Sequence, residues 1–188
     1  MPNYSKSGKN LFPLTDQQFK EVLDDGKFAK TEHKAFTVAL FYYGVRVTEA
    51  LRATRSQFDI SETHIRFDVG ERLKKRKWSK KKQKEIVARG ILRTHPLPLR
   101  LNRPYVNLLK EAIESTEPDK RVFPYCRKTG YNICDRAFHT YPHRFRLSNF
   151  TRIAQEKGIA VLKSWSALTL VALEYYMGVV DIEERDEG

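Results

Sequence analysis

The stretch PHRFRLSNFTRIAQEKG, at residues 142–158, predicts a helix over residues 144–157 that ends at its glycine. His143 and Arg146 lie three positions apart where this helix begins, so their side chains share one face. An imidazole beside a guanidinium suits phosphoryl transfer, because the arginine neutralises a nonbridging oxygen while the histidine donates or accepts a proton. The alternative interpretation is that these basic side chains contact only a nucleic-acid backbone or solvent.

A further basic side chain, Arg46, follows a helix predicted at residues 31–43. Gly44 ends that helix, and a short third helix is expected to begin near Thr48, a capping residue. Arg46 would therefore aim a planar, permanently charged guanidinium at a phosphate, with Glu49 able to hold it in place. The alternative is a surface arginine that pairs with Glu49 at helical spacing.

Two adjacent tyrosines, Tyr175 and Tyr176, lie in an apolar stretch at residues 168–180. A tyrosine is a nucleophile when its phenol is oriented and flanked by positive charge. The alternative is that both rings are packing residues. Trp165 is another candidate, because its indole N–H can donate to a phosphate oxygen, although a lone tryptophan also suits the core.

Between these segments the periodicity changes to that of strands. Within residues 58–69 the apolar side chains Phe58 and Ile60, and then Ile65, Phe67 and Val69, are spaced two apart. Residues 91–99 read as a second strand that ends at prolines. Residues 72–90 between them are densely basic. We therefore expect residues 63–99 to form a small sheet whose long hairpin tip is basic.

The remaining pattern is helical. A capping box of Thr15 and Gln18 predicts a first helix, and helices are also expected from Asn102 and over residues 132–141. A length of 188 residues suits a single domain. The predicted fold class is mainly α with a small antiparallel β-sheet (α+β), and the predicted divisions are a flexible lead at 1–13, one domain at 14–180 and an acidic tail at 181–188.

The net charge of the chain indicates which class of partner it binds. Lys and Arg number 35 against 23 Asp and Glu, a formal net charge of +12, which favours a polyanion: nucleic acid first, an anionic membrane surface second. The alternative is charge that serves only solubility. No run of 18 apolar residues and no apolar signal core is present in the sequence, so we expect a cytoplasmic, DNA-associated protein without a membrane partner.

The two cysteines are too few for a disulfide framework. Cys134, His139 and His143 have spacings loosely like those of a zinc site. The fourth ligand would be Cys126, eight residues before Cys134, and that is not a standard zinc knuckle. We therefore expect no metal and no other cofactor.

Three segments in this order resemble the catalytic domain of the tyrosine recombinase (phage integrase) family. GVRVTEAL at 44–51 resembles its first arginine box, VFPYCRKTG at 122–130 its Phe-Pro loop, and PHRFRLSNFTRIAQEKGI at 142–159 its second box and helix. The resemblance covers about residues 12–180 and implies that family's catalytic-domain fold. The usual His-Thr-Phe after the second box is replaced here by Leu147-Ser148-Asn149.

The resemblance also implies roles for individual side chains. Arg46 and Arg146 would clamp the scissile phosphate, His143 would assist proton transfer, and Trp165 would stand where the family has His or Trp. A hairpin lysine, Lys74 or Lys75, would protonate the leaving 5′-oxygen. Other basic side chains are expected to contact the DNA backbone: Lys77, Lys80, Lys81, Lys82 and Arg144.

The implied nucleophile is Tyr175 or Tyr176. In the family the His or Trp usually precedes the nucleophile by nine residues, whereas Trp165 precedes these tyrosines by ten and eleven. Tyr175 is therefore the closer fit, and Tyr176 stays open.

The implied activity is site-specific recombination or integration of double-stranded DNA through a 3′-phosphotyrosine, without metal or ATP. A homo-tetramer on DNA and an origin in a virus or other mobile element are family implications. The family usually also has an N-terminal helical domain that clamps the DNA, and the resemblance leaves open whether this sequence is a minimal recombinase or a catalytic fragment. Two alternatives remain: a type IB topoisomerase-like enzyme that relaxes DNA, and a non-catalytic DNA-binding or regulatory protein of the same fold.

Overall fold

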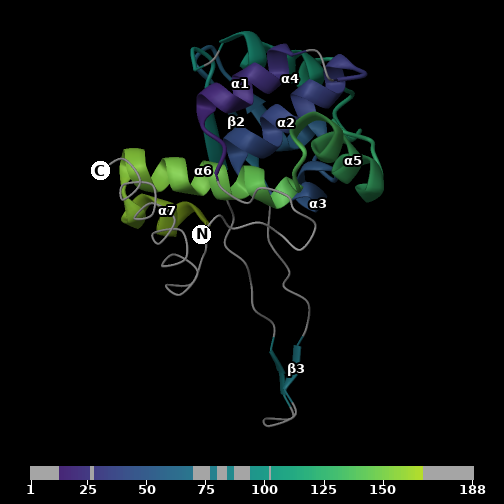
Figure 1. Cartoon of the computed structure of the whole chain (residues 1–188). Helices are drawn as coiled ribbons and strands as arrows, with labels where there is room; N and C mark the ends of the chain where they lie inside the picture. The colour runs from purple at the N-terminus through teal and green to yellow at the C-terminus, as the bar shows by residue number, and fades with distance from the viewer. Residues whose placement is uncertain are drawn as a thin grey trace, which may run out of the picture.

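The computed structural model describes residues 13–25, 28–69, 77–79, 84–86, 94–101 and 103–166. Helices form one body around a central helix, and a small sheet lies beside it (Figure 1). The predicted fold class is therefore confirmed. No helix in these ranges is long and apolar enough to cross a membrane.

The central helix is α2, Thr31–Tyr43, which packs against α4, Arg103–Glu114, and α6, Pro142–Lys157. Every residue from 35 to 43 is buried, so this helix is enclosed on all sides and shows almost no amphipathic pattern. Its end is Gly44, in the left-handed conformation with φ 59°. The helix predicted at 31–43 and its glycine stop are confirmed.

The first helix, α1, spans Asp16–Asp24 and begins with the predicted capping box. The Thr15 hydroxyl accepts from the Gln18 N–H, and the Gln18 side chain accepts from the Thr15 N–H, each at 3.1 Å. Phe19 on this helix stacks on Phe41 of α2, with ring centroids 4.0 Å apart. The cap thus starts α1 where its phenylalanine enters the core.

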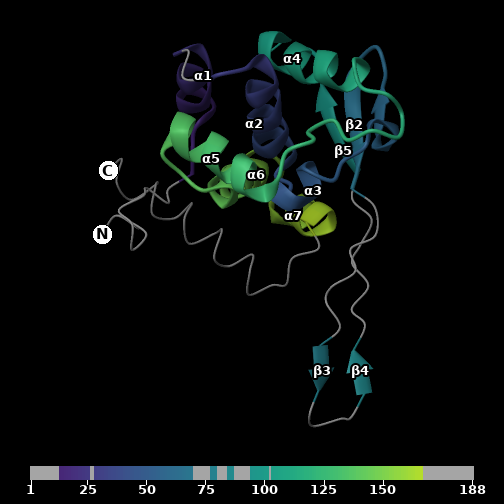
Figure 2. The ribbon, with the colours of Figure 1, turned by 90° about the vertical axis from the view of Figure 1, so that its right-hand side faces the viewer.

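The sheet is antiparallel with the order β1-β2-β5, formed by Phe58–Ile60, His64–Asp68 and Thr94–Pro98. Ile65 and Phe67 of β2 point to the core, which explains their period of two. Further along the chain β3, Lys77–Ser79, pairs with β4, Lys84–Ile86, as a separate ladder drawn apart from the main sheet in Figure 2. The predicted pairing of the segment at 58–69 with the segment at 91–99 is confirmed by β2 and β5, but the first segment forms two strands, β1 and β2, rather than one. Most of the predicted basic tip lies outside the described residues.

Two short elements, α3 at Val47–Ala50 and the 3-10 helix η1 at Arg55–Gln57, lie between α2 and the sheet in the chain. Another short helix, α7 at Ile159–Ser166, follows α6 and packs against it. The third helix begins at Val47, with Arg46 rather than Thr48 in the N-cap position. The prediction of Thr48 as the capping residue was therefore wrong.

The helix α5 differs most from prediction. It spans Arg127–Phe138, so it begins five residues before the expected start at 132 and ends at His139, whose backbone is left-handed with φ 48°. Gly130 lies inside it, although glycine suggested a loop. A Cβ at Gly130 would lie 3.2 Å from Val47 Cγ2, so the glycine serves close packing against α3.

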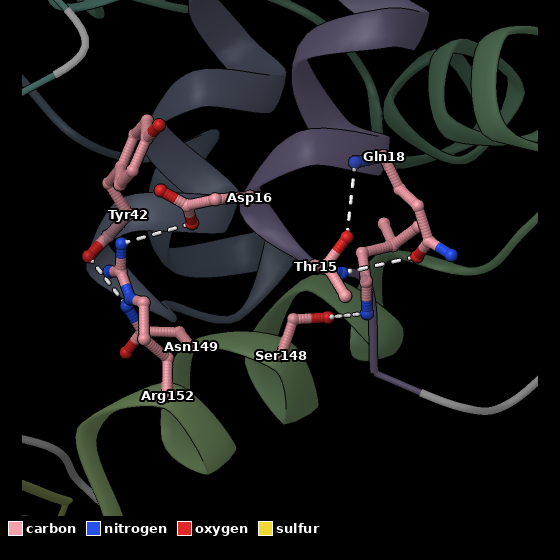
Figure 3. A network of polar contacts seen from close by, with 8 residues as sticks. Thr15, Asp16, Gln18, Tyr42, Ser148, Asn149 and Arg152 are labelled. Carbon is pink, nitrogen blue, oxygen red and sulfur yellow. Dashed lines mark hydrogen bonds and ion pairs between the residues drawn. The ribbon is translucent and has the colours of Figure 1, made fainter. Parts of the chain in front are cut away.

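Polar contacts fix α6 against the elements on either side of it (Figure 3). The Ser148 hydroxyl accepts from the Leu14 N–H at 2.7 Å, just before α1. The Asn149 amide donates to the Tyr42 carbonyl at 2.7 Å, near the end of α2. These contacts hold α6 in register with the turn after α2, where Arg46 lies.

Candidate functional site

A pocket of about 310 Å³ lies where the turn after α2 meets the first turns of α5 and α6. Figure 1 shows α3, α5 and the start of α6 at the same end of the domain. The pocket brings Arg46 together with His143 and Arg146, which lie about a hundred positions later in the sequence. Its lining residues are Val45, Arg46, Val47, Thr48, Arg127, Tyr131, Pro142, His143 and Arg146.

Arg146 forms the inner side of this pocket and is only 3% exposed. Its Nη1 donates to the Gly44 carbonyl at 2.8 Å, and its guanidinium carbon lies 4.3 Å from the centre of the Phe150 ring. The guanidinium is therefore held from two directions before any ligand binds.

Gly44 makes this contact possible. A Cβ added at Gly44 would lie 2.5 Å from Asn149 Oδ1, and the positive φ already disfavours side chains other than glycine. The absent side chain lets the turn after α2 lie directly on α6. Arg46 and Arg146 therefore reach one pocket from two separate segments.

Arg46 is exposed at the pocket, in the N-cap position of α3. Its backbone N–H donates to Glu49 Oε2 at 2.7 Å. Glu49 thus caps the helix through the main chain of Arg46 and fixes the point from which the guanidinium projects. This contact of Glu49 is therefore with the backbone of Arg46, whereas the sequence suggested that Glu49 would hold the guanidinium.

His143 lies in the first turn of α6, with part of its side chain open to solvent. Partial burial lowers the pKa of its imidazole from the ordinary value of 6.5, and the charges of Arg146 and Arg46 lower it further. The ring is therefore mainly neutral at pH 7, so one nitrogen can accept a proton while the other donates a hydrogen bond.

Two pocket residues were missed in the sequence, Arg127 and Tyr131. Arg127 Nη2 donates to the Tyr131 hydroxyl at 3.3 Å, and its guanidinium carbon lies 5.3 Å from the centre of the Tyr131 ring. Both precede residue 132, where the helix was expected to begin. The helical spacing of four between them was the available signal, and it has meaning only if α5 begins at Arg127.

Arg144 does not join the pocket. Its side chain is buried, 9% exposed, and burial lowers the pKa of its guanidinium. A buried guanidinium does not favour the predicted contact with a DNA backbone. We therefore do not retain Arg144 as a DNA-binding residue.

For the other predicted site residues, the structure does not describe the side chains. Two of them lie on described backbone alone, Lys77 in β3 and Trp165 in α7. The rest lie outside the described residues: Lys74, Lys75, Lys80, Lys81, Lys82, Tyr175 and Tyr176.

Cys134, one of the side chains weighed as zinc ligands, is buried, whereas Cys126 is exposed before α5. Over the described part of the chain, no group of three or more His, Cys, Asp or Glu side chains has the geometry to hold a metal ion.

No protein-family model matches the sequence, and no curated protein matches it. Solved structures do. XerH site-specific recombinase bound to difH substrate, in a post-cleavage complex, aligns with a TM-score of 0.59 and 16% identity over 98% of this chain and 55% of that chain. A variant of the Tn1549 transposon integrase in complex with a circular intermediate DNA gives a TM-score of 0.58 and 15% identity over 89% and 62%.

The pre-cleavage complex of XerH with difH gives a TM-score of 0.58 and 14% identity, over 93% of this chain and 56% of that chain. The chain therefore spans 55% to 62% of the length of these three structures. At identities of 14% to 16%, the similarity between this chain and these structures is a similarity of fold. The chain has the fold of a tyrosine recombinase catalytic domain.

Proposed function

We propose that this chain is the catalytic domain of a site-specific DNA recombinase or integrase that acts through a 3′-phosphotyrosine. The observation that carries the proposal is the meeting of Arg46, His143 and Arg146 in one pocket. Structures of similar fold are described as recombinase and integrase complexes with DNA, which supports DNA as the partner. The net charge of +12 agrees with a polyanionic substrate.

Arg46 and Arg146 would bind the two nonbridging oxygens of the scissile phosphate. Negative charge grows on these oxygens when a fifth oxygen approaches phosphorus, so fixed guanidinium groups stabilise the transition state more than the ground state. Arg146 suits this role because its contacts with Gly44 and Phe150 hold it before DNA arrives. Little reorganisation is then needed during the reaction.

The chemical step exchanges one phosphodiester for another. The phenol oxygen of Tyr175 or Tyr176 would bond to phosphorus, and the bond from phosphorus to the 5′-oxygen would break. Neutral His143 would take up the phenol proton, and Lys74 or Lys75 would give a proton to the departing 5′-oxygen. Trp165 would donate to a phosphate oxygen. No ATP is required because the phosphodiester bond energy is kept in the phosphotyrosine, and no metal is required because the two arginines and the lysine supply the positive charge.

The basic hairpin would supply backbone contacts through Lys77 and the run at residues 80–82. Binding that depends on lysine and arginine contacts with phosphates weakens steeply with salt, because counterions are released from DNA on binding. Assembly as a homo-tetramer on DNA is part of the same proposal, since exchange of strands requires several active sites on two duplexes.

The test is a covalent adduct with nicked suicide duplexes whose sequence is randomised around the nick, detected on a denaturing gel. We expect wild type to form the adduct and Tyr175→Phe to lose it, with Tyr176→Phe retaining it. The reverse pattern would assign Tyr176 as nucleophile. Binding without any adduct, over a series of salt concentrations, would contradict the enzymatic proposal and favour a non-catalytic DNA-binding protein.

A further inference from the structure

The pocket has more positive charge than one phosphate needs. A phosphodiester carries a single negative charge shared by two nonbridging oxygens, and Arg46 and Arg146 would bind these two oxygens. A third guanidinium, that of Arg127, lines the same pocket, and none of the lining residues in the described part of the chain is acidic. Such an excess of charge fits a ligand with more than one anionic group.

Arg127 is oriented by its own helix. Its Nη2 donates to the Tyr131 hydroxyl at 3.3 Å while the guanidinium lies over the Tyr131 ring at 5.3 Å. The pair lies one helical turn apart on α5, and Arg127 is exposed whereas Tyr131 is half-buried. The tyrosine thus limits the positions of the guanidinium and leaves it in reach of a ligand in the pocket.

The packing of α5 explains why this pair reaches the pocket. A Cβ on Gly130 would lie 3.3 Å from the Phe36 ring and 3.4 Å from Leu51 Cδ1, in addition to its close approach to Val47. A larger residue at Gly130 would push the first turn of α5 away from α3. The glycine therefore keeps Arg127 and Tyr131 beside the turn that carries Arg46.

We propose that Arg127, held by Tyr131, forms a second anion subsite that binds the phosphate next to the scissile one in the same DNA strand. The inference rests on the proposed function, because it needs a DNA strand in the pocket. A DNA strand always carries a second negative charge close to the scissile phosphate, on the neighbouring phosphate of the same strand. The subsite would set the position of the scissile phosphate between Arg46 and Arg146.

The experiment compares the salt dependence of binding to a labelled duplex of random sequence, measured by fluorescence anisotropy on the full chain. Arg127→Ala should lower the slope of log affinity against log salt by about 0.9, the value for one phosphate contact. The ratio of wild-type to variant affinity would then fall about 3.5-fold between 50 and 200 mM salt. Arg127→Lys, which keeps the charge, should restore the slope.

The matched control is Arg136→Ala, an exposed arginine in the last turn of α5 that does not line the pocket. It should leave the slope at the wild-type value. An unchanged slope in Arg127→Ala, or an equal fall in both alanine variants, would overturn the second subsite.

The outcome is separable from that for the proposed function. A wild-type adduct on the suicide duplexes, with no effect of Arg127→Ala on the slope, contradicts the second subsite alone. A slope that depends on Arg127, together with no adduct, contradicts the catalytic proposal alone.

Discussion

The two sides of the pocket are built differently. On the inner side the pocket is lined by Arg146, whose guanidinium is 3% exposed and is held by the Gly44 carbonyl and the Phe150 ring. On the outer side, formed by Arg127 and Tyr131, the guanidinium is exposed and contacts one tyrosine of its own helix. Substitutions on the inner side should therefore change both stability and function, whereas those on the outer side should change ligand binding alone.

The largest effect is expected for Arg146→Lys. Lysine keeps the charge but lacks the planar fork that contacts Gly44 and stacks on Phe150. The rate of adduct formation on suicide duplexes should fall about 10²–10³-fold, the cost of losing one fixed donor to a developing negative charge. Arg127→Lys should give a much smaller fall, and equal falls in the two variants would remove the distinction between the two sides.

Gly44→Ala should give the next largest effect, on stability. The methyl group would meet Asn149 Oδ1 at 2.5 Å on a backbone with φ 59°, so strain and overpacking should cost about 2–4 kcal/mol. Urea unfolding followed by circular dichroism measures this loss. In the background of Asn149→Ala the same substitution should cost less, because the two nearest atoms, Asn149 Oδ1 and Cγ, have been removed. Strictly additive free energies would contradict the contact.

Asn149→Ala alone should cost about 1–3 kcal/mol, because the buried Tyr42 carbonyl loses the amide that donates to it at 2.7 Å. The same urea titration measures it. Tyr131→Phe is the matched change on the outer side: it removes the hydroxyl that accepts from the exposed Arg127, and its cost should stay within about 0.5 kcal/mol. Similar losses of unfolding free energy in Asn149→Ala and Tyr131→Phe would show that the two sides do not differ in their contribution to stability.

Part of the pocket was predictable from the sequence, and the side formed by Arg127 and Tyr131 was not. Gly44, Arg46, His143 and Arg146 were singled out by a glycine stop and by a spacing of three at a helix start, and these are local signals that the packing did not override. Arg127 was hidden because it follows a Phe-Pro segment and precedes Gly130.

Glycine inside a helix usually weakens it, and the reason for Gly130 is its approach to α3, a contact between segments far apart in the chain. For the same kind of reason Arg144 resembled a DNA contact. Its position next to His143 says nothing about which face of α6 is buried, and that depends on what packs against the helix. Periodicity predicts elements well, whereas the surroundings of a single side chain depend on tertiary contacts.

The smallest effect is expected from pH, through His143. Partial burial, Arg146 and Arg46 lower the pKa of its imidazole from 6.5 in the folded state, so the unfolded chain binds the proton more tightly. The contribution of the neutral ring to stability is then complete above pH 6.5 and is lost as the pH falls from 6.5 through the lower folded value.

Burial also lowers the pKa of His33, so this second histidine adds a change in stability of the same sign. The effect of His143 must therefore be measured as the difference between wild type and His143→Gln. The free energy of unfolding of wild type minus that of His143→Gln should be constant above pH 6.5 and should decrease below it. The rate of adduct formation by wild type should fall in the same range, because the protonated ring cannot accept the phenol proton. A difference in unfolding free energy that increases on acidification would mean that a negative partner faces His143, and the pocket would then not be the cationic site that Arg46 and Arg146 indicate.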